Sequence, residues 1–101
     1  MALGGALQAA IDLDYLEAPE ASRAVAAAAF VAVSLGGDVS IPTEMRALAA
    51  EWRSDTRGLK PAAMFAVEKI RAGSELAELW ADSDDLAAWL TSLDRISSGL
   101  A

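Results

Sequence analysis

A run of ten apolar residues, Ala24 to Val33, constrains the fold of this chain more than any other feature. The run reads AVAAAAFVAV, and its surroundings predict one helix over about 20–35. Pro19 suits the first position of such a helix, and the glycine pair at 36–37 suits its end. A helix that is apolar on all sides is usually buried at the centre of a bundle. The run is too short to cross a bilayer, which needs roughly 20 apolar residues.

Helical periodicity also dominates the rest of the sequence, and strand signals are nearly absent. Only the segment 38–41 (DVSI) has some β character. We expect further helices over about 5–13, from Pro42 or Thr43 onward, over 61–73, over 75–81, and over a last segment that carries Leu86 to Ile96 and ends at Gly99. The fold class predicted is therefore all-α, a compact bundle of five to six short helices around the Ala-rich one, with residues 1–101 as a single domain.

The composition excludes several kinds of chemistry. The chain has 101 residues and contains neither cysteine nor histidine, which excludes disulfides, thiolate metal sites and histidine-dependent catalytic triads. Its net charge of −7 repels phosphate backbones and anionic lipid, so we expect no nucleic-acid partner and no membrane. The N-terminal sequence MALGGALQAA lacks the pattern of a signal peptide, which makes a soluble cytoplasmic protein the default expectation.

Three acids, Asp82, Asp84 and Asp85, lie between Trp80 and Trp89. In one continuous helix these tryptophans would occupy opposite faces, so we expect the chain to turn between them. Asp82 or Ser83 then caps the last helix, and Asp84 and Asp85 lie in its first turn, where negative charge suits the helix dipole. A calcium loop is the alternative, but the glycine and the distant glutamate of that motif are missing.

A second acidic cluster surrounds Tyr15 and consists of Asp12, Asp14, Glu17 and Glu20. Paired carboxylates can serve acid–base catalysis when a pocket separates their pKa values. We expect these acids to lie instead in a solvated loop and at a helix terminus. No catalytic residue, metal ligand or cofactor is therefore predicted.

Two aromatic residues are candidates for an interaction surface. Trp52 ends an apolar stripe beside a loop of mixed charge, and Phe65 lies off the apolar face of its own helix. Exposed apolar area of this kind is commonly covered by association, which makes a homodimer one expectation.

Two blocks of sequence resemble a bacterial family known as domain of unknown function 4259. They are 14–37 (DYLEAPEASRAVAAAAFVAVSLGG) and 74–93 (SELAELWADSDDLAAWLTSL), with the segment 66–70 (AVEKI) between them. The resemblance spans about 4–96 and implies a helical fold and a bacterial source. It transfers no catalytic residue.

The chain departs from this family at two places. Family members usually begin with a segment containing tryptophan and glycine, which this chain lacks, so we expect an N-terminal segment to be missing. They also often carry an acid where Ala28 and Ala29 stand here.

The function expected from these features is a non-catalytic protein-interaction module. A small acidic helical protein can neutralise a basic partner, as bacterial immunity proteins do. The alternative is a carboxylate-based enzyme or metal-binding protein that uses the acids near Tyr15 or Asp82.

Overall fold

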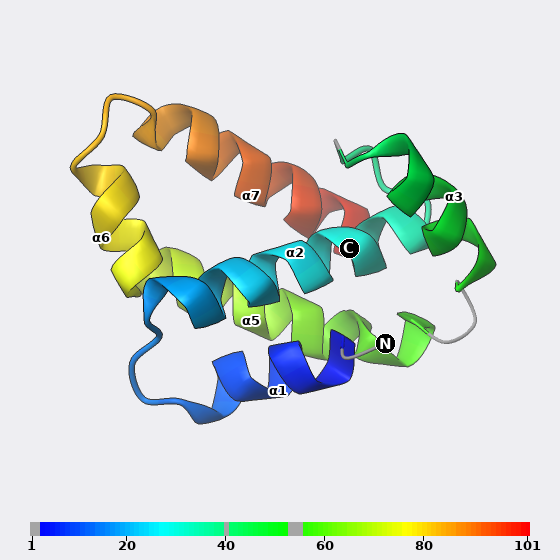
Figure 1. The fold of residues 1–101 in the computed structure, drawn as a ribbon, viewed down its shortest axis with the longest axis horizontal. Helices are drawn as coiled ribbons and strands as arrows, with labels where there is room; N and C mark the ends of the chain where they lie inside the picture. Colours follow the sequence, from blue (N-terminus) through cyan, green and yellow to red (C-terminus); the bar gives the residue numbers. More distant parts are fainter. Residues whose placement is uncertain (1–2, 40, 53–55) are drawn as a thin grey trace.

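One helix, α2 (Ala18–Ser34), runs through the middle of the molecule, and the other helices pack around it (Figure 1). The computed structural model describes residues 3–39, 41–52 and 56–101. These residues contain helices and no strand, which confirms the all-α prediction. The remaining helices are α1 (Leu3–Asp12), α3 (Thr43–Glu51), the 3₁₀ helix η1 (Arg57–Leu59), α5 (Lys60–Ala72), α6 (Glu75–Ala81) and α7 (Leu86–Leu100).

The second half of α2 is buried on all sides, as the apolar run predicts. Every residue of 27–34 is buried, and α2 contacts each of the other α-helices in the described part of the chain. Its alanines allow this because their short side chains let neighbouring backbones approach closely. The first half differs from the prediction: Ala26 is exposed and Val25 is half-buried, because no helix covers that side.

The end of α2 forms a close backbone crossing with α7. Gly36 adopts a φ of 97°, and the Gly37 N–H donates to the Ala32 carbonyl at 2.8 Å, as in a Schellman motif. The prediction that Gly99 ends the last helix is wrong, since α7 continues to Leu100. A Cβ atom added at Gly99 would lie 3.1 Å from both the Gly37 Cα and the Ala32 Cβ. Gly99 therefore allows α7 to approach the end of α2 closely, and it does not end α7.

Helices α5 and α7 each bury one regular stripe against α2. In α5 the buried residues are Ala63, Ala66, Val67 and Ile70, and in α7 they are Trp89, Leu93, Ile96 and Leu100. Helix α1 lies beside α5, where the Lys69 ammonium donates to the carbonyls of Ile11, at 2.9 Å, and Leu13. A cation there suits the negative end of the α1 dipole.

The corner between α6 and α7 confirms the predicted turn but not its predicted cap. Ser74 caps α6, and its Oγ accepts from the Ala77 N–H at 3.1 Å. Helix α7 begins only at Leu86, with Asp85 as the N-cap residue and no side-chain cap. The expectation that Asp82 or Ser83 caps α7 is therefore wrong, because these residues still belong to the turn. Leu79 of α6 is 56% exposed.

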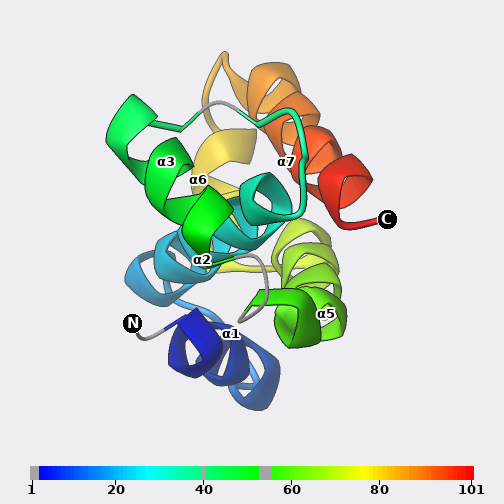
Figure 2. The same cartoon turned by 90° about the vertical axis from the view of Figure 1, so that its right-hand side faces the viewer.

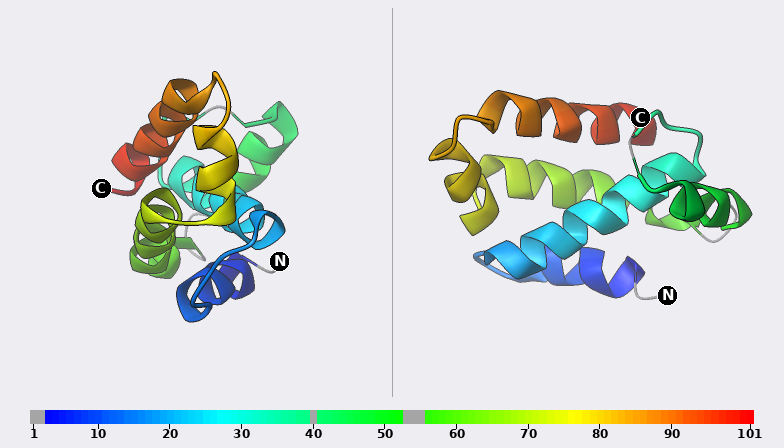
Figure 3. Two further views of the ribbon diagram at one scale, coloured as in Figure 1. Left: turned by 90° about the vertical axis from the view of Figure 1, so that its left-hand side faces the viewer. Right: turned by 45° about the horizontal axis from the view of Figure 1, so that its top comes forward.

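The end-on views show how the short helices sit. Helix α6 crosses one end of the bundle, and α3 lies at the other end beside the C-terminal half of α2 (Figures 2 and 3). Among the described residues, no helix has both the length and the apolar character that a membrane span requires.

The glycine crossing generates a stability prediction. In Gly37→Ala the new Cβ would lie 2.8 Å from the Ala32 carbonyl oxygen and 2.9 Å from the Gly99 Cα, so the backbones must separate. We expect a loss of about 1–3 kcal/mol in the free energy of unfolding, measured by urea denaturation. The control is Gly5→Ala, whose Cβ meets nothing within 4 Å. It should leave stability unchanged or raise it by up to about 1 kcal/mol. Equal effects of the two changes would contradict the proposed crossing constraint.

Candidate functional site

An apolar groove of about 520 Å³ lies over the first half of α2, between α3 on one side and α6 and α7 on the other. It exists because α3 packs chiefly against α2 and leaves the space between itself and α7 unfilled. Its lining is Ser22, Val25, Ala26, Ala29, Phe30, Val39, Ile41, Pro42, Met45, Leu76, Trp80, Trp89, Ser92, Arg95 and Ile96. We take this groove as the candidate functional site.

Two stacked indole rings form the wall of the groove at its α6 end. The ring centroids of Trp80 and Trp89 are 6.1 Å apart, and the ring planes are 11° from parallel. The turn between α6 and α7 therefore brings together two residues that a continuous helix would separate. The sequence predicts the turn between these tryptophans but assigns neither of them to an interaction surface. Trp89 is buried and Trp80 is half-buried, and both rings line the groove.

The floor and the opposite wall consist of small or flexible apolar side chains. Ala26 and Ala29 form part of the floor, where their methyl groups leave room for a bound side chain. Met45 stands on the α3 side and is 39% exposed. Methionine is unbranched and adapts its shape to different partners. The groove thus combines rigid aromatic and adaptable aliphatic surface.

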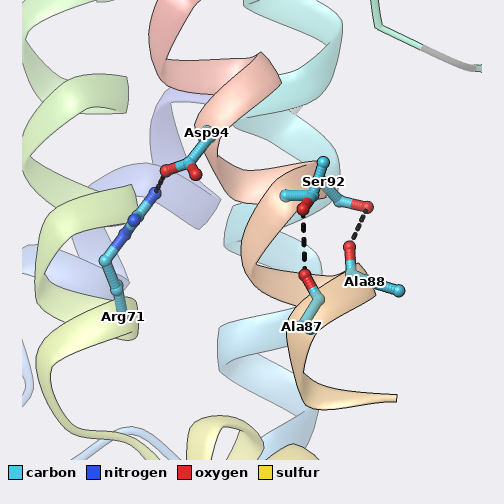
Figure 4. A network of polar contacts seen from close by, with 6 residues as sticks. Arg71, Ala87, Ala88, Ser92 and Asp94 are labelled. Carbon is cyan, nitrogen blue, oxygen red and sulfur yellow. Dashed lines mark hydrogen bonds and ion pairs between the residues drawn. The ribbon is translucent and has the colours of Figure 1, made fainter.

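Arg95 is the one charged side chain among the described residues that line the groove. It has no ion-pair partner there, since its neighbour Asp94 pairs with Arg71 at 2.6 Å on the α5 side (Figure 4). Ser92 adds a hydroxyl that donates to the Ala88 carbonyl within α7 at 3.1 Å. The polar chemistry of the groove is therefore concentrated at the Arg95 end.

The two residues predicted as interaction candidates lie outside the groove. Phe65 is 57% exposed on α5, as its position off the apolar face predicts. Trp52 follows the last residue of α3 and is half-buried against the core. The sequence does not predict the groove, because its residues come from four helices and the segment before α3, and no local pattern reveals how these are placed. No feature of the apolar run distinguishes the exposed Ala26 from the buried alanines beside it.

The acids of the α6–α7 corner are exposed and do not converge on a common point. Among the described residues, no three histidine, cysteine, aspartate or glutamate side chains are grouped so that they could hold a metal ion. The Ser83 hydroxyl donates to the Trp80 carbonyl at 2.8 Å and accepts from the Asp85 N–H at 3.1 Å. These bonds hold the turn together.

Comparison with protein families identifies the family of this chain. The model of the family described as Domain of unknown function (DUF4259) matches residues 2–92. The chain belongs to this family. No curated protein matches it, and no solved structure does so.

In this DUF4259 domain, the acids expected around Tyr15 are not the ones that bind it. The Tyr15 hydroxyl donates to Glu78 Oε2 of α6 at 2.6 Å, and Glu75 Oε1 accepts from the Ala18 N–H at 2.8 Å. Asp12 accepts instead from Gln8 at 2.9 Å. The carboxylates of α6 therefore fasten that helix to the segment before α2.

The same contact changes the acidity of the phenol. The hydrogen bond to Glu78, aided by some burial and by the charges of Glu78, Glu75 and Glu17, raises the pKa of Tyr15 from 10.0 to about 12. Because the folded state holds the proton more tightly, this contribution to stability is present below pH 10.0 and is lost as the pH rises to about 12.

Tyr15 is the single tyrosine of this DUF4259 domain, so its ionisation can be followed alone by absorbance at about 295 nm. We expect a midpoint near pH 12 in the folded protein. Glu78→Ala should move the midpoint towards 10.0, because the acceptor and the nearest charge are both removed. Glu44→Ala, a change to an exposed acid on α3, should leave it unmoved. An unaltered midpoint in Glu78→Ala would rule out this hydrogen bond as the cause.

Proposed function

We propose that the protein is a non-catalytic protein-interaction module whose groove receives the apolar face of an amphipathic helix from a partner. The observation that supports this most is the groove itself: apolar, open, and lined by side chains of four helices. Its volume of about 520 Å³ falls within the range of roughly 300–1,000 Å³ that bound ligands usually occupy. It can hold several side chains of one helix face, but not a whole helix.

The chemistry of the walls favours a protein partner. Tryptophan is enriched among residues that contribute most to binding energy, and the groove presents two of them side by side. An amphipathic helix offers apolar side chains at i, i+3, i+4 and i+7, which suits an apolar groove between helices. The Ala26 and Ala29 methyl groups allow such a helix to approach α2 closely.

The charge of the protein favours a basic partner. Asp and Glu outnumber Lys and Arg by 15 to 8, so a cationic protein would be attracted at long range and held in register by the acids around the groove. Neutralisation of a basic protein, of the kind that bacterial immunity proteins perform, is the role that we propose on this basis.

The competing hypothesis, a carboxylate-based enzyme or metal-binding protein, receives less support. Glu75 and Glu78, the acids nearest Tyr15, are engaged in hydrogen bonds to a backbone N–H and to the phenol. The acids near Asp82 are exposed around a tight turn. Neither group of carboxylates contributes a residue to the lining of the apolar groove.

A synthetic amphipathic peptide tests the groove. The probe is a helix of about 15 residues with leucine on one face and lysine elsewhere, long enough to be helical once bound. We expect it to bind and to change the tryptophan fluorescence. Met45→Glu should weaken binding by about ten-fold or more, although it adds attractive charge, because it places a carboxylate in the apolar contact.

The matched control is Phe65→Glu, which adds the same charge to an exposed apolar position outside the groove. It should leave peptide affinity within about two-fold. If the two variants bind alike, or if no such peptide binds, the groove is not a helix-docking site.

Phe65 generates a separate prediction about self-association. Its ring is 57% exposed on α5, and a two-fold dimer would cover one such patch with its copy. We expect sedimentation equilibrium to give a dimer at high micromolar concentration, and Phe65→Glu to shift it towards monomer. A monomer mass for the unmodified protein at that concentration would refute the homodimer. A folded Phe65→Glu variant that stays dimeric would place the interface elsewhere.

A further inference from the structure

The two ends of the groove differ in charge. At the α6–α7 corner, beside Trp80 and Trp89, Asp82, Asp84 and Asp85 are all exposed, with no cation paired to them in the described part of the chain. At the far end of the α7 wall, Arg95 lines the groove, and no carboxylate of the described residues lies within ion-pair distance of it. Along the α7 wall, the exposed charge therefore changes from three aspartates beside the two indole rings to the cation of Arg95.

The positions of the charged residues along α7 can be compared with those of the residues that line the groove. Asp85 precedes Trp89 by four residues, Ser92 by seven and Arg95 by ten, so all four share one side of the helix. Trp89, Ser92 and Arg95 all line the groove. At about 1.5 Å per residue, Asp85 and Arg95 are separated by about 15 Å along the axis.

Acidic residues near Arg95 reduce the difference in charge between the two ends of the groove but do not reverse it. Asp38 lines a neighbouring polar hollow together with Arg95, and Glu44 lies in the first turn of α3. Arg46 offsets one of them, and its guanidinium donates to the Val39 carbonyl at 2.6 Å. Asp94 lines the same hollow but is paired with Arg71. The two remaining acids, Asp38 and Glu44, and the two arginines, Arg46 and Arg95, leave this end about neutral, whereas the opposite corner carries three unbalanced aspartates.

We propose that the partner helix lies in the groove with its basic N-terminal end over Asp82, Asp84 and Asp85 and with an acidic C-terminal end beside Arg95. About ten residues separate the two charged ends, to match the spacing on α7. The dipole of the bound helix acts in the same direction, since its N-terminus is positive and its C-terminus negative. The partner helix therefore runs parallel to α7. This inference rests on the proposed function and specifies the partner's charge pattern.

The experiment uses a peptide with a leucine face, two lysines in its first turn, two glutamates in its last turn and blocked termini. A fluorophore is attached at the lysine end. The protein has no cysteine, so a nitroxide label can be placed at a single site by Ala81→Cys, near the acidic corner, or by Ser98→Cys, beyond Arg95. Both positions are exposed.

We expect the label at position 81 to quench the fluorophore about five-fold more strongly than the label at position 98, the size that two exposed charge pairs can produce. The triple change Asp84→Lys, Asp85→Lys and Arg95→Glu should reverse the preference. In the unmodified background, 1 M salt should remove the preference and retain binding, because the Debye length falls to about 3 Å while apolar contacts persist.

The outcomes separate this inference from the proposed function. Binding with equal quenching from the two labels, or with a preference that survives both the charge reversal and 1 M salt, overturns the orientation and leaves the groove as a docking site. The salt measurement decides the question if the triple variant does not fold. If the peptide binds neither of the two labelled proteins, both the proposed function and the orientation are overturned.

Discussion

The packing of α2 against every other α-helix of the described residues is the constraint on which the rest of the structure depends. One helix can contact so many neighbours only if its own side chains are short, and in the buried half of α2 only Phe30 is large. The same requirement for closeness explains why Gly37 and Gly99 meet at the end of α2. Hydrophobic burial is thus achieved here by many small contacts rather than by a few large side chains.

This mode of packing also determines where the groove lies. Helices α1, α5 and α7 take the buried sides of α2, whereas α3 and α6 are short and sit at opposite ends of the bundle (Figures 1 and 3). The first half of α2 consequently keeps one face uncovered, with the indoles of Trp80 and Trp89 beside it. The groove is the part of the core that too few helices reach, and the segment before α3 completes its lining with Val39, Ile41 and Pro42.

The sequence predicted the fold class and most helix boundaries, because apolar periodicity and the turn residues are local signals. The Ser74 cap and the exposure of Phe65 were predictable for the same reason. Gly99 was misread because a glycine near a helix end has two uses, and only the approach of Gly37 decides between them. The candidate site was out of reach, since Met45, Trp80 and Arg95 are brought to one groove by tertiary packing alone.

Helix α6 gives the groove a wall that is packed less deeply than the other helices. None of its residues is buried, although Leu76, Ala77 and Trp80 pack against the core. The helix is also held by the Ser74 cap, the indole stack, two carboxylate hydrogen bonds and the backbone bond from the Glu75 N–H to the Leu16 carbonyl. Elements with so few buried contacts open locally at a fraction of the global unfolding free energy. The width of the groove can therefore vary while α2 and its buried neighbours stay folded. The fold thus combines a closely packed centre around α2 with a groove whose width can change.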